Sequence, residues 1–245
     1  MAKTVVRDEA RQRRRRTKQG AVLTHAQIVE TALRMLREHG AQGFTARRLG
    51  LALGADASTV YRYFAGMDEL TLAIAGELMR RAMEHWRPVG AWRADLRALG
   101  LSIHSAYLAH PQAAVLTASR VSGRPEEIAA DEAVLGLLRE AGFPDAAAVR
   151  IYHVFIDQTL AFAALDAASL ALPEAARQSD EEMWQATYAT LPQQTHPHIS
   201  ATAGLLMARM NSSAYPAALD LLLSAAAAEL STVAEGAAPK PRDGC

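Results

Sequence analysis

Apolar positions near the start of the chain recur at three- and four-residue steps, and small or polar residues interrupt them at short intervals. Thr24, followed three residues later by Gln27, is a capping-box pattern, which predicts that a helix begins here. Gly40 is a typical residue for the end of that helix. Between these points, the helical period brings one set of side chains to a common face: Ile28, Ala32, Met35, Leu36 and His39.

Two shorter helices are predicted directly after this one. Thr45 is suited to cap the first of them, and Gly54 is suited to end it. The turn at 55–57 leads into the next helix, in which Val60 and Phe64 point toward the core. A helix, a tight turn and a helix in this order predict a helix-turn-helix, whose second helix fits the major groove of DNA.

The remainder of the chain shows one helical pattern after another and no strand alternation, with Pro and Gly at most helix ends. The predicted fold is therefore all-α, with an N-terminal helix-turn-helix DNA-binding domain and a C-terminal helical domain. We also expect the second domain to be a ligand-binding and dimerisation domain. The later helices are expected at 68–86, 92–110, 112–120, 125–141, 145–168, 179–190, 198–210 and 215–234. The expected domains are a basic flexible arm at 1–20, the DNA-binding domain at 21–67, the helical domain at 68–234 and a disordered tail at 235–245.

Charge is divided unevenly along the chain, although the whole chain is neutral. Residues 1–66 carry 13 Lys and Arg against 5 Asp and Glu, whereas the remaining residues carry 13 against 21. A basic N-terminal part suits a polyanion such as double-stranded DNA. The Arg run in it is either an arm that contacts phosphate or the minor groove, or a solvated tail. The predicted DNA contacts are Arg13, Arg14, Arg15 and Arg16 in the arm, Thr45, Arg47 and Arg48 at the second helix, and Ser58, Thr59, Tyr61, Arg62 and Tyr63 in the third.

This N-terminal segment resembles the tetracycline-repressor (TetR) family of bacterial regulators over about fifty residues. Met67 stands where many members carry a phosphate-binding Lys, and Arg62-Tyr63 where many carry an aromatic residue or Arg followed by His. The resemblance implies a dimeric repressor that binds a palindromic operator and is released from it by a small-molecule effector. The matching residues are Ala32-Leu33, Gly40, Phe44-Thr45, Arg48-Leu49, Leu53-Gly54, Ser58-Thr59-Val60-Tyr61, Phe64 and Leu70.

Two of the later helices have the pattern of a subunit interface. The helix at 145–168 is apolar on two faces, and the helix at 215–234 combines a leucine face with several alanines that allow close approach. Two such helices from each of two subunits would form a four-helix interface, although both could also pack inside a monomeric core. The predicted interface residues are Tyr152, Ile156, Leu160, Leu219, Leu222, Leu223, Ala226 and Leu230.

The middle helices combine large apolar side chains with a few polar groups, a mixture that suits a ligand cavity. The same mixture also occurs in an ordinary core, and the prediction of a pocket rests mainly on the family resemblance. The candidate ligand-binding residues are Met83, Trp86, Leu101, His104, Ser105, Tyr107, Leu108, Leu138, Phe155, Gln158, Thr159, Phe162 and Trp184.

Signals for other chemistry are weak. The single cysteine, Cys245, excludes an internal disulfide, and no uninterrupted apolar run approaches the roughly 18 residues that a bilayer requires. We therefore expect a cytoplasmic protein without a membrane partner. His196 and His198, or His153 with Asp157, fall short of a metal set, and no phosphate loop or nucleophile motif occurs. We expect no enzyme, cofactor or metal site.

Two alternatives stay open at this point. The chain could be a helical small-molecule-binding or catalytic protein without sequence-specific DNA binding, or a regulator that works without a ligand. A test of sequence-specific DNA binding separates the first alternative from the favoured repressor.

Overall fold

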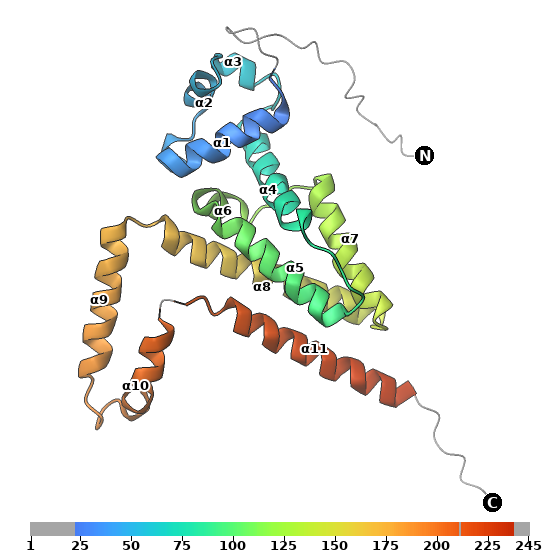
Figure 1. The fold of residues 1–245 in the computed structure, drawn as a ribbon, viewed down its shortest axis with the longest axis vertical. Coiled ribbons are helices and arrows are strands. Elements are labelled where there is room, and N and C mark those ends of the chain that lie inside the picture. The colour runs from blue at the N-terminus through green and yellow to red at the C-terminus, as the bar shows by residue number, and fades with distance from the viewer. Residues whose placement is uncertain (1–22, 211, 238–245) are drawn as a thin grey trace, which may run out of the picture. The chain divides into compact units, whose positions relative to one another are not determined.

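The computed structural model describes residues 23–210 and 212–237, and this part of the chain consists of helices and connections without a strand (Figure 1). The predicted arm, with Arg13 to Arg16, lies outside the described residues. The chain divides into two compact units between Ile74 and Ala75, which lie inside one helix. The prediction of an all-α fold with an N-terminal helix-turn-helix is confirmed.

The N-terminal unit is built from short helices with well-defined ends. They are α1 (His25–His39), the 3-10 turn η2 (Ala41–Gly43), α2 (Ala46–Ala52), α3 (Ala57–Val60) and the first part of α4 (Met67–Glu84). Thr24 and Gln27 form the expected capping box, and Gly40 ends α1 with a positive φ of 65°. Ile28, Leu49 and Phe64 are buried at the centre of the unit.

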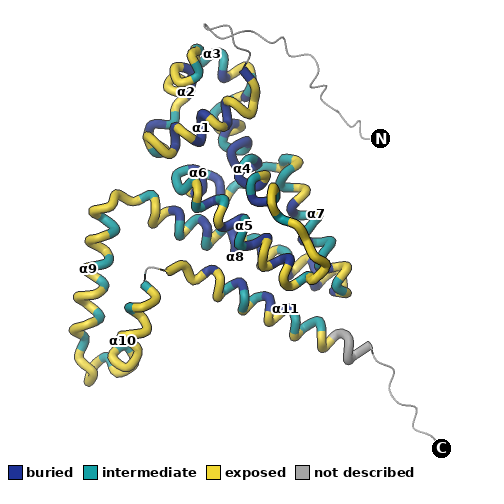
Figure 2. Tube along the Cα trace, viewed as in Figure 1, coloured by how far each residue is buried: buried dark blue, intermediate teal, exposed yellow. Residues whose placement is uncertain are grey.

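The C-terminal unit is a packed group of longer helices. It contains the rest of α4, α5 (Trp92–Leu108), α6 (Pro111–Thr117), α7 (Pro125–Glu140), α8 (Asp145–Ala171) and α11 (Tyr215–Ala237), with α8 in contact with α5, α6, α7 and α11 (Figure 1). Figure 2 shows the buried residues concentrated along α5 and α8. Because α11 reaches Ala237, the first residues of the predicted disordered tail at 235–245 are helical.

Helix α8 is the one described helix that is long and apolar enough to cross a membrane. Its buried side chains instead follow a four-residue step from Ile151 through Phe155, Thr159 and Ala163 to Ala167, and they face the helices that surround it. One face of α8 thus packs in the core of this unit, whereas other apolar side chains of the helix, such as Leu165, are exposed.

Helices α9 (Glu174–Thr190) and α10 (Pro197–Arg209) pair with each other, and neither contains a buried residue (Figure 2). The sequence prediction of a connector up to Ser179 is wrong, because α9 begins directly after Pro173. Pro173 has an extended backbone at the N-cap, and Glu174 in the first turn pairs with Arg177 and Gln178. The composition of this first turn is typical of a loop. Its side chains pair at three- and four-residue spacing, however, which stabilises a helix.

Candidate functional sites

The turn between α2 and α3 depends on two glycines. Gly54 has a φ of +64°, a conformation that disfavours other residues, and the Ala55 N–H donates to the carbonyl of Gly50 over 2.8 Å. A Cβ atom at Gly50 would lie 2.7 Å from the carbonyl carbon of Asp56. The backbones of α2 and α3 therefore approach each other at Gly50 more closely than a side chain permits.

Asp56 fixes the start of α3. Its Oδ1 accepts hydrogen bonds from the Thr59 backbone N–H over 3.0 Å and from the hydroxyls of Ser58 and Thr59 over 2.5 and 3.3 Å. These bonds, that of Ser58 foremost, hold the pKa of Asp56 below its usual value. Asp56 thus caps the helix and orients two of its predicted DNA-contacting hydroxyls.

The outer surface of α2 and α3 is polar and basic. Arg47, Arg48 and Arg62 are exposed, and Tyr61 retains 51% of its surface. Thr45 caps α2 by accepting the Arg48 backbone N–H over 3.3 Å. Within the N-terminal unit, this face offers three guanidinium groups to an anionic partner.

The Tyr63 side chain makes contacts within the N-terminal unit. Its hydroxyl donates to the Leu23 carbonyl over 2.8 Å, and its own carbonyl lies 3.1 Å from Nε2 of His25. The His25 ring meets the rings of Tyr63 and Phe64 edge-on, each at a centroid distance of 5.2 Å. These contacts hold the start of α1 against the segment that follows α3.

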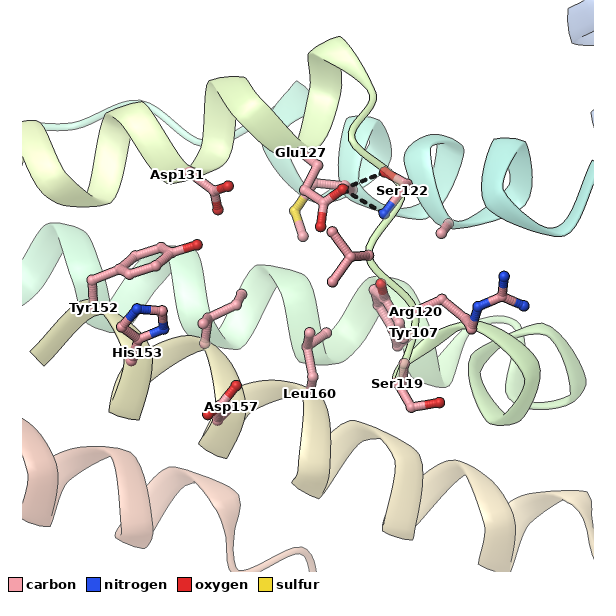
Figure 3. A pocket seen from close by; sticks show the side chains of 15 residues that line it. Tyr107, Ser119, Arg120, Ser122, Glu127, Asp131, Tyr152, His153, Asp157 and Leu160 are labelled. Atoms are coloured by element: carbon pink, nitrogen blue, oxygen red, sulfur yellow. Dashed lines mark hydrogen bonds between the residues drawn. The ribbon is translucent and has the colours of Figure 1, made fainter. Parts of the chain in front are cut away.

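A cavity of about 310 Å³ lies in the C-terminal unit between α7 and α8, with α4 and the segment after α6 completing its wall (Figure 3). This volume is at the lower end of the range for small-molecule sites. Its lining consists of Ala75, Met79, Tyr107, Ala118, Ser119, Arg120, Val121, Ser122, Glu127, Asp131, Tyr152, His153, Ile156, Asp157 and Leu160.

Glu127 anchors the segment that borders this cavity. One of its carboxylate oxygens accepts the backbone N–H groups of Ser122 and Gly123, each over 2.7 Å, together with the Ser122 hydroxyl (Figure 3). Burial and the charge of Glu127 raise the pKa of Tyr107 to about 12. The Glu127 carboxylate therefore both shapes the wall and sets the local potential.

Asp131 lies one turn along α7 from Glu127, opposite Tyr152 and His153 of α8 (Figure 3). Burial raises the pKa of Asp131, and the charge of Glu127 adds to the rise, while the Tyr152 hydroxyl and the His153 charge oppose it. Burial, followed by the interaction with Asp131, likewise raises the pKa of Tyr152.

A second and more open hollow of about 640 Å³ lies where α8 meets α9. Polar side chains from these two helices, among them Asp166, Glu174 and Arg177, dominate its lining. Among the described residues, no group of three or more His, Cys, Asp and Glu side chains is placed to hold a metal ion. The first cavity is thus the better candidate for an organic ligand.

Family models match both units of the chain. The N-terminal model, for bacterial regulatory proteins of the tetR family, matches residues 28–74. The C-terminal model, for tetracyclin repressor-like C-terminal domains, matches residues 87–229. The chain belongs to the TetR family of bacterial regulatory proteins. The family resemblance predicted from the first unit is confirmed, and it extends through the second.

Three individual relatives match parts of the chain at 27–29% identity. The chain is 29% identical to the class D tetracycline repressor protein of Escherichia coli over 127 residues, which are 50% of this chain and 57% of that protein. The chain thus spans little more than half the length of this curated relative. A possible TetR family regulator from Streptomyces coelicolor is 27% identical, with a TM-score of 0.71 over 84% of this chain and all of that one. BioQ, solved with its double-stranded DNA operator, is 28% identical, with a TM-score of 0.53 over 60% of this chain and 88% of that one.

The TetR fold places the described DNA-binding candidates together in the N-terminal unit. Thr45, Arg47, Arg48, Tyr61 and Arg62 are exposed on or beside α2 and α3. Ser58 and Thr59 lie at the start of α3 with their hydroxyls directed to Asp56. Tyr63 is half-buried and carries the contacts to Leu23 and His25. The DNA contacts of all these residues stay predictions.

Tyr215 of α11 lies among several of the predicted ligand-binding residues. The Tyr215 hydroxyl lies 2.7 Å from Oγ1 of Thr159, and its ring stacks on His104 at a centroid distance of 4.7 Å. His104 in turn lies 2.8 Å from a carboxylate oxygen of Asp166. Of the candidates, only Tyr107 lines the first cavity, while Leu108 and Trp184 line the second hollow. The candidates that line neither are Met83, Trp86, Leu101, His104, Ser105, Leu138, Phe155, Gln158, Thr159 and Phe162.

The predicted interface residues lie in three different environments within the chain, and their contact with a second copy stays a prediction. Leu219, Leu223 and Ala226 are buried within the chain, because α11 packs its leucine face on α5 and α8. Leu222 and Leu230 are only partly exposed. The other predicted interface residues, Tyr152, Ile156 and Leu160, line the first cavity.

Sequence reasoning did not single out Gly50, Asp56, Glu127, Asp131 or Tyr215 as site residues. An Asp followed three residues later by a helical Thr is a cap signal that could have identified Asp56. Glu127 and Asp131, four residues apart on a predicted helix, could have been recognised as an acidic face. Nothing in the local sequence indicates that Tyr215 enters the core, because its contacts with Gly100 and Thr159 are distant in the chain.

Proposed function

We propose that this chain is a transcriptional repressor that binds a palindromic DNA operator as a homodimer and leaves it when a small molecule occupies the cavity beside α7 and α8. The observation that carries the proposal is helix α4. Its first half places Leu70 and Ile74 in the core of the N-terminal unit, and its second half places Ala75 and Met79 in the C-terminal unit, where they line the cavity.

The basic face of α2 and α3 supports the binding of DNA. Arg47, Arg48 and Arg62 are exposed there, and guanidinium groups bind phosphate and read guanine through paired hydrogen bonds. The relative BioQ, which shares the fold of this part, is bound to an operator in its structure. Arg62 is the proposed base reader, because it lies two residues beyond the end of α3 with its side chain exposed.

An apolar face on α8 and α11 supports the homodimer. Val154 and Leu165 on α8, together with Leu221 on α11, are 47%, 66% and 73% exposed. On α8, Ala161 and Ala168 lie on the same helical face as Val154 and Leu165, and both are exposed. Such a face requires a partner, and a two-fold copy supplies the second recognition helix that a palindromic site needs.

The continuity of α4 supports coupling between ligand and DNA. A ligand that contacts Met79 acts on a helix whose other half belongs to the N-terminal unit, where Leu70 and Ile74 are buried. If the bound form spaces the two recognition helices wrongly for successive major grooves, operator affinity must fall by linkage. A coupling of roughly 1–3 kcal/mol lowers that affinity about 5- to 150-fold. A regulator of this kind catalyses no reaction and works in the cytoplasm, where its DNA lies.

The experiment is selection of binding sites from random double-stranded DNA, followed by titration of the selected site. We expect a two-fold symmetric site, and we expect Arg62→Ala to cost roughly 1–3 kcal/mol and to relax one base position in each half-site. Arg209→Ala, which removes an exposed charge from α10 in the other unit, is the matched control and should leave the preference unchanged. Failure to select any site would favour a helical ligand-binding protein without sequence-specific DNA binding.

A further inference from the structure

We propose that the cavity beside α7 and α8 selects an amphipathic organic cation, such as a quaternary ammonium or a protonated amine that carries an aromatic or aliphatic body. The inference rests on the proposed function only in taking this cavity as the effector site. It follows from the lining of the cavity, which combines an apolar floor with an excess of carboxylates.

The floor of the cavity suits an apolar body. Met79 of α4 and Ile156 and Leu160 of α8 supply aliphatic surface, and the rings of Tyr107 and Tyr152 supply aromatic surface. Burial of such surface removes it from water, which favours binding. Tyrosine ring faces also attract an alkylammonium group within about 6 Å.

The charges that line the cavity favour a cation. Glu127 and Asp131 lie one turn apart on α7, and Asp157 lies on α8 (Figure 3). The cationic side chains in the lining are Arg120 and His153. Figure 3 shows the Arg120 side chain directed away from Asp131 and Tyr152, toward the edge of the cavity. The ligand therefore enters a region in which negative charge exceeds positive charge.

Asp131 benefits most from a cationic ligand. The backbone N–H groups of Ser122 and Gly123 compensate the charge of Glu127, whereas Asp131 faces Tyr152 and His153. Burial disfavours the charge on Asp131, and the charge of Glu127 repels it. A ligand cation would offset both effects, whereas an anion of the same shape would increase them.

The test uses three probes that share a naphthalene body: a cation, trimethyl(1-naphthylmethyl)ammonium; a neutral alcohol, 1-naphthalenemethanol; and an anion, 1-naphthaleneacetate. Calorimetric titration of the full chain at neutral pH should show the cation binding about tenfold more tightly than the alcohol, with the anion weakest. A cation that binds no more tightly than the anion, or three probes without measurable binding, would overturn the inference.

Asp131→Asn removes one charge without changing shape, and it should lower the affinity for the cation about tenfold while leaving the alcohol unaffected. Glu132→Gln is the matched control, because Glu132 is the neighbouring exposed acid on α7 and does not line the cavity. Asp157→Asn is a second variant, at an exposed position, for use if Asp131→Asn impairs folding. Equal losses in Asp131→Asn and Glu132→Gln would contradict a role for the cavity charge.

Acid titration gives an independent readout. The quaternary probe keeps its charge at every pH, so a change in its affinity with pH reflects protonation of groups in the protein. Protonation discharges Asp131 as pH falls through its raised pKa, and the affinity for the cation should fall with it. Glu127, Asp157 and His153 also line the cavity, so the comparison with Asp131→Asn is needed: that variant should show a shallower pH dependence.

The operator assay separates this inference from the proposed function. If the cation binds through Asp131 but leaves the operator complex intact, the selectivity of the cavity stands and effector-controlled release fails. If a neutral or anionic compound releases the operator while the cavity shows no preference for cations, the proposed repressor stands and this inference falls.

Discussion

Helix α8 and the α9–α10 pair are neighbours in the chain, but they differ in how many of their residues are buried against other helices. Seven residues of α8 are buried, and four neighbouring helices surround it. Helices α9 and α10 have no buried residue, and their described contacts are mostly local, such as the stack of Trp184 on Tyr188 at a centroid distance of 3.9 Å. Helical structure alone therefore says little about how strongly a segment is held in the fold.

The difference follows from side-chain pattern. Every fourth residue of α8 from Ile151 to Ala167 meets the core, so forming this helix removes a continuous apolar face from water. In α9 and α10, Met183 and Leu205 are 67% and 74% exposed, and pairs such as Glu174 with Arg177 stabilise the helix only locally. We expect α9 and α10 to open at a lower free energy than α8.

The largest expected effect is at Phe155, which is fully buried in α8. Phe155→Ala removes a ring from the core and should cost about 3–5 kcal/mol of unfolding free energy, measured by urea denaturation. Val149→Ala on the same helix is the control, because Val149 is 46% exposed, and its cost should stay near 0.5 kcal/mol. Similar losses at the two positions would contradict the assignment of buried and exposed faces on α8.

Glycine substitutions should act in opposite directions in the two regions. A Cβ at Gly100 of α5 would lie 2.4 Å from the Tyr215 hydroxyl and 3.1 Å from the Phe155 ring, so Gly100→Ala should destabilise by about 1–3 kcal/mol. Gly204 in α10 has no atom within 4 Å of such a Cβ, and Gly204→Ala should stabilise its helix by up to about 1 kcal/mol.

Thermal unfolding and far-ultraviolet circular dichroism measure both glycine variants. If the two substitutions shift the melting temperature in the same direction, the result would contradict either the open space around Gly204 or the close contact at Gly100. Gly136→Ala on α7, where a Cβ also meets no atom within 4 Å, serves as a control in a helix of the packed group.

Helix positions could be predicted from the sequence largely because Pro, Gly and capping residues mark their ends. The expected helix at 125–141 is observed as Pro125–Glu140, and the capping box at Thr24 is present. The start of α9 was placed wrongly, since the polar run after Pro173 has the composition of a loop. Local sequence signals thus identify most helix ends, and they fail where the first turns of a helix are polar.

The assignment of helix faces could not be predicted to the same extent. Helix α8 is apolar around most of its circumference, so its pattern does not distinguish the face of Phe155 in the core from that of Ile156 at the cavity and that of Leu165 at the surface. Only contacts with distant helices make this choice. The packing of Tyr215 beside Gly100 and Thr159 also depends on contacts between distant parts of the chain, and most of the predicted pocket residues line neither cavity.

The smallest expected effect tests whether the α9–α10 pair has a partner. Leu205 is 74% exposed, so Leu205→Ser should change the unfolding free energy of an isolated chain by no more than about 0.5 kcal/mol. Measured over a range of protein concentrations, the effect should stay small if the pair remains solvated in the proposed dimer. A loss that grows as dimers form would show that a second copy covers Leu205, because burial by a partner adds its binding free energy to the stability. Amide hydrogen exchange on the same samples should then slow in α9 and α10, whereas α8 should be protected at every concentration.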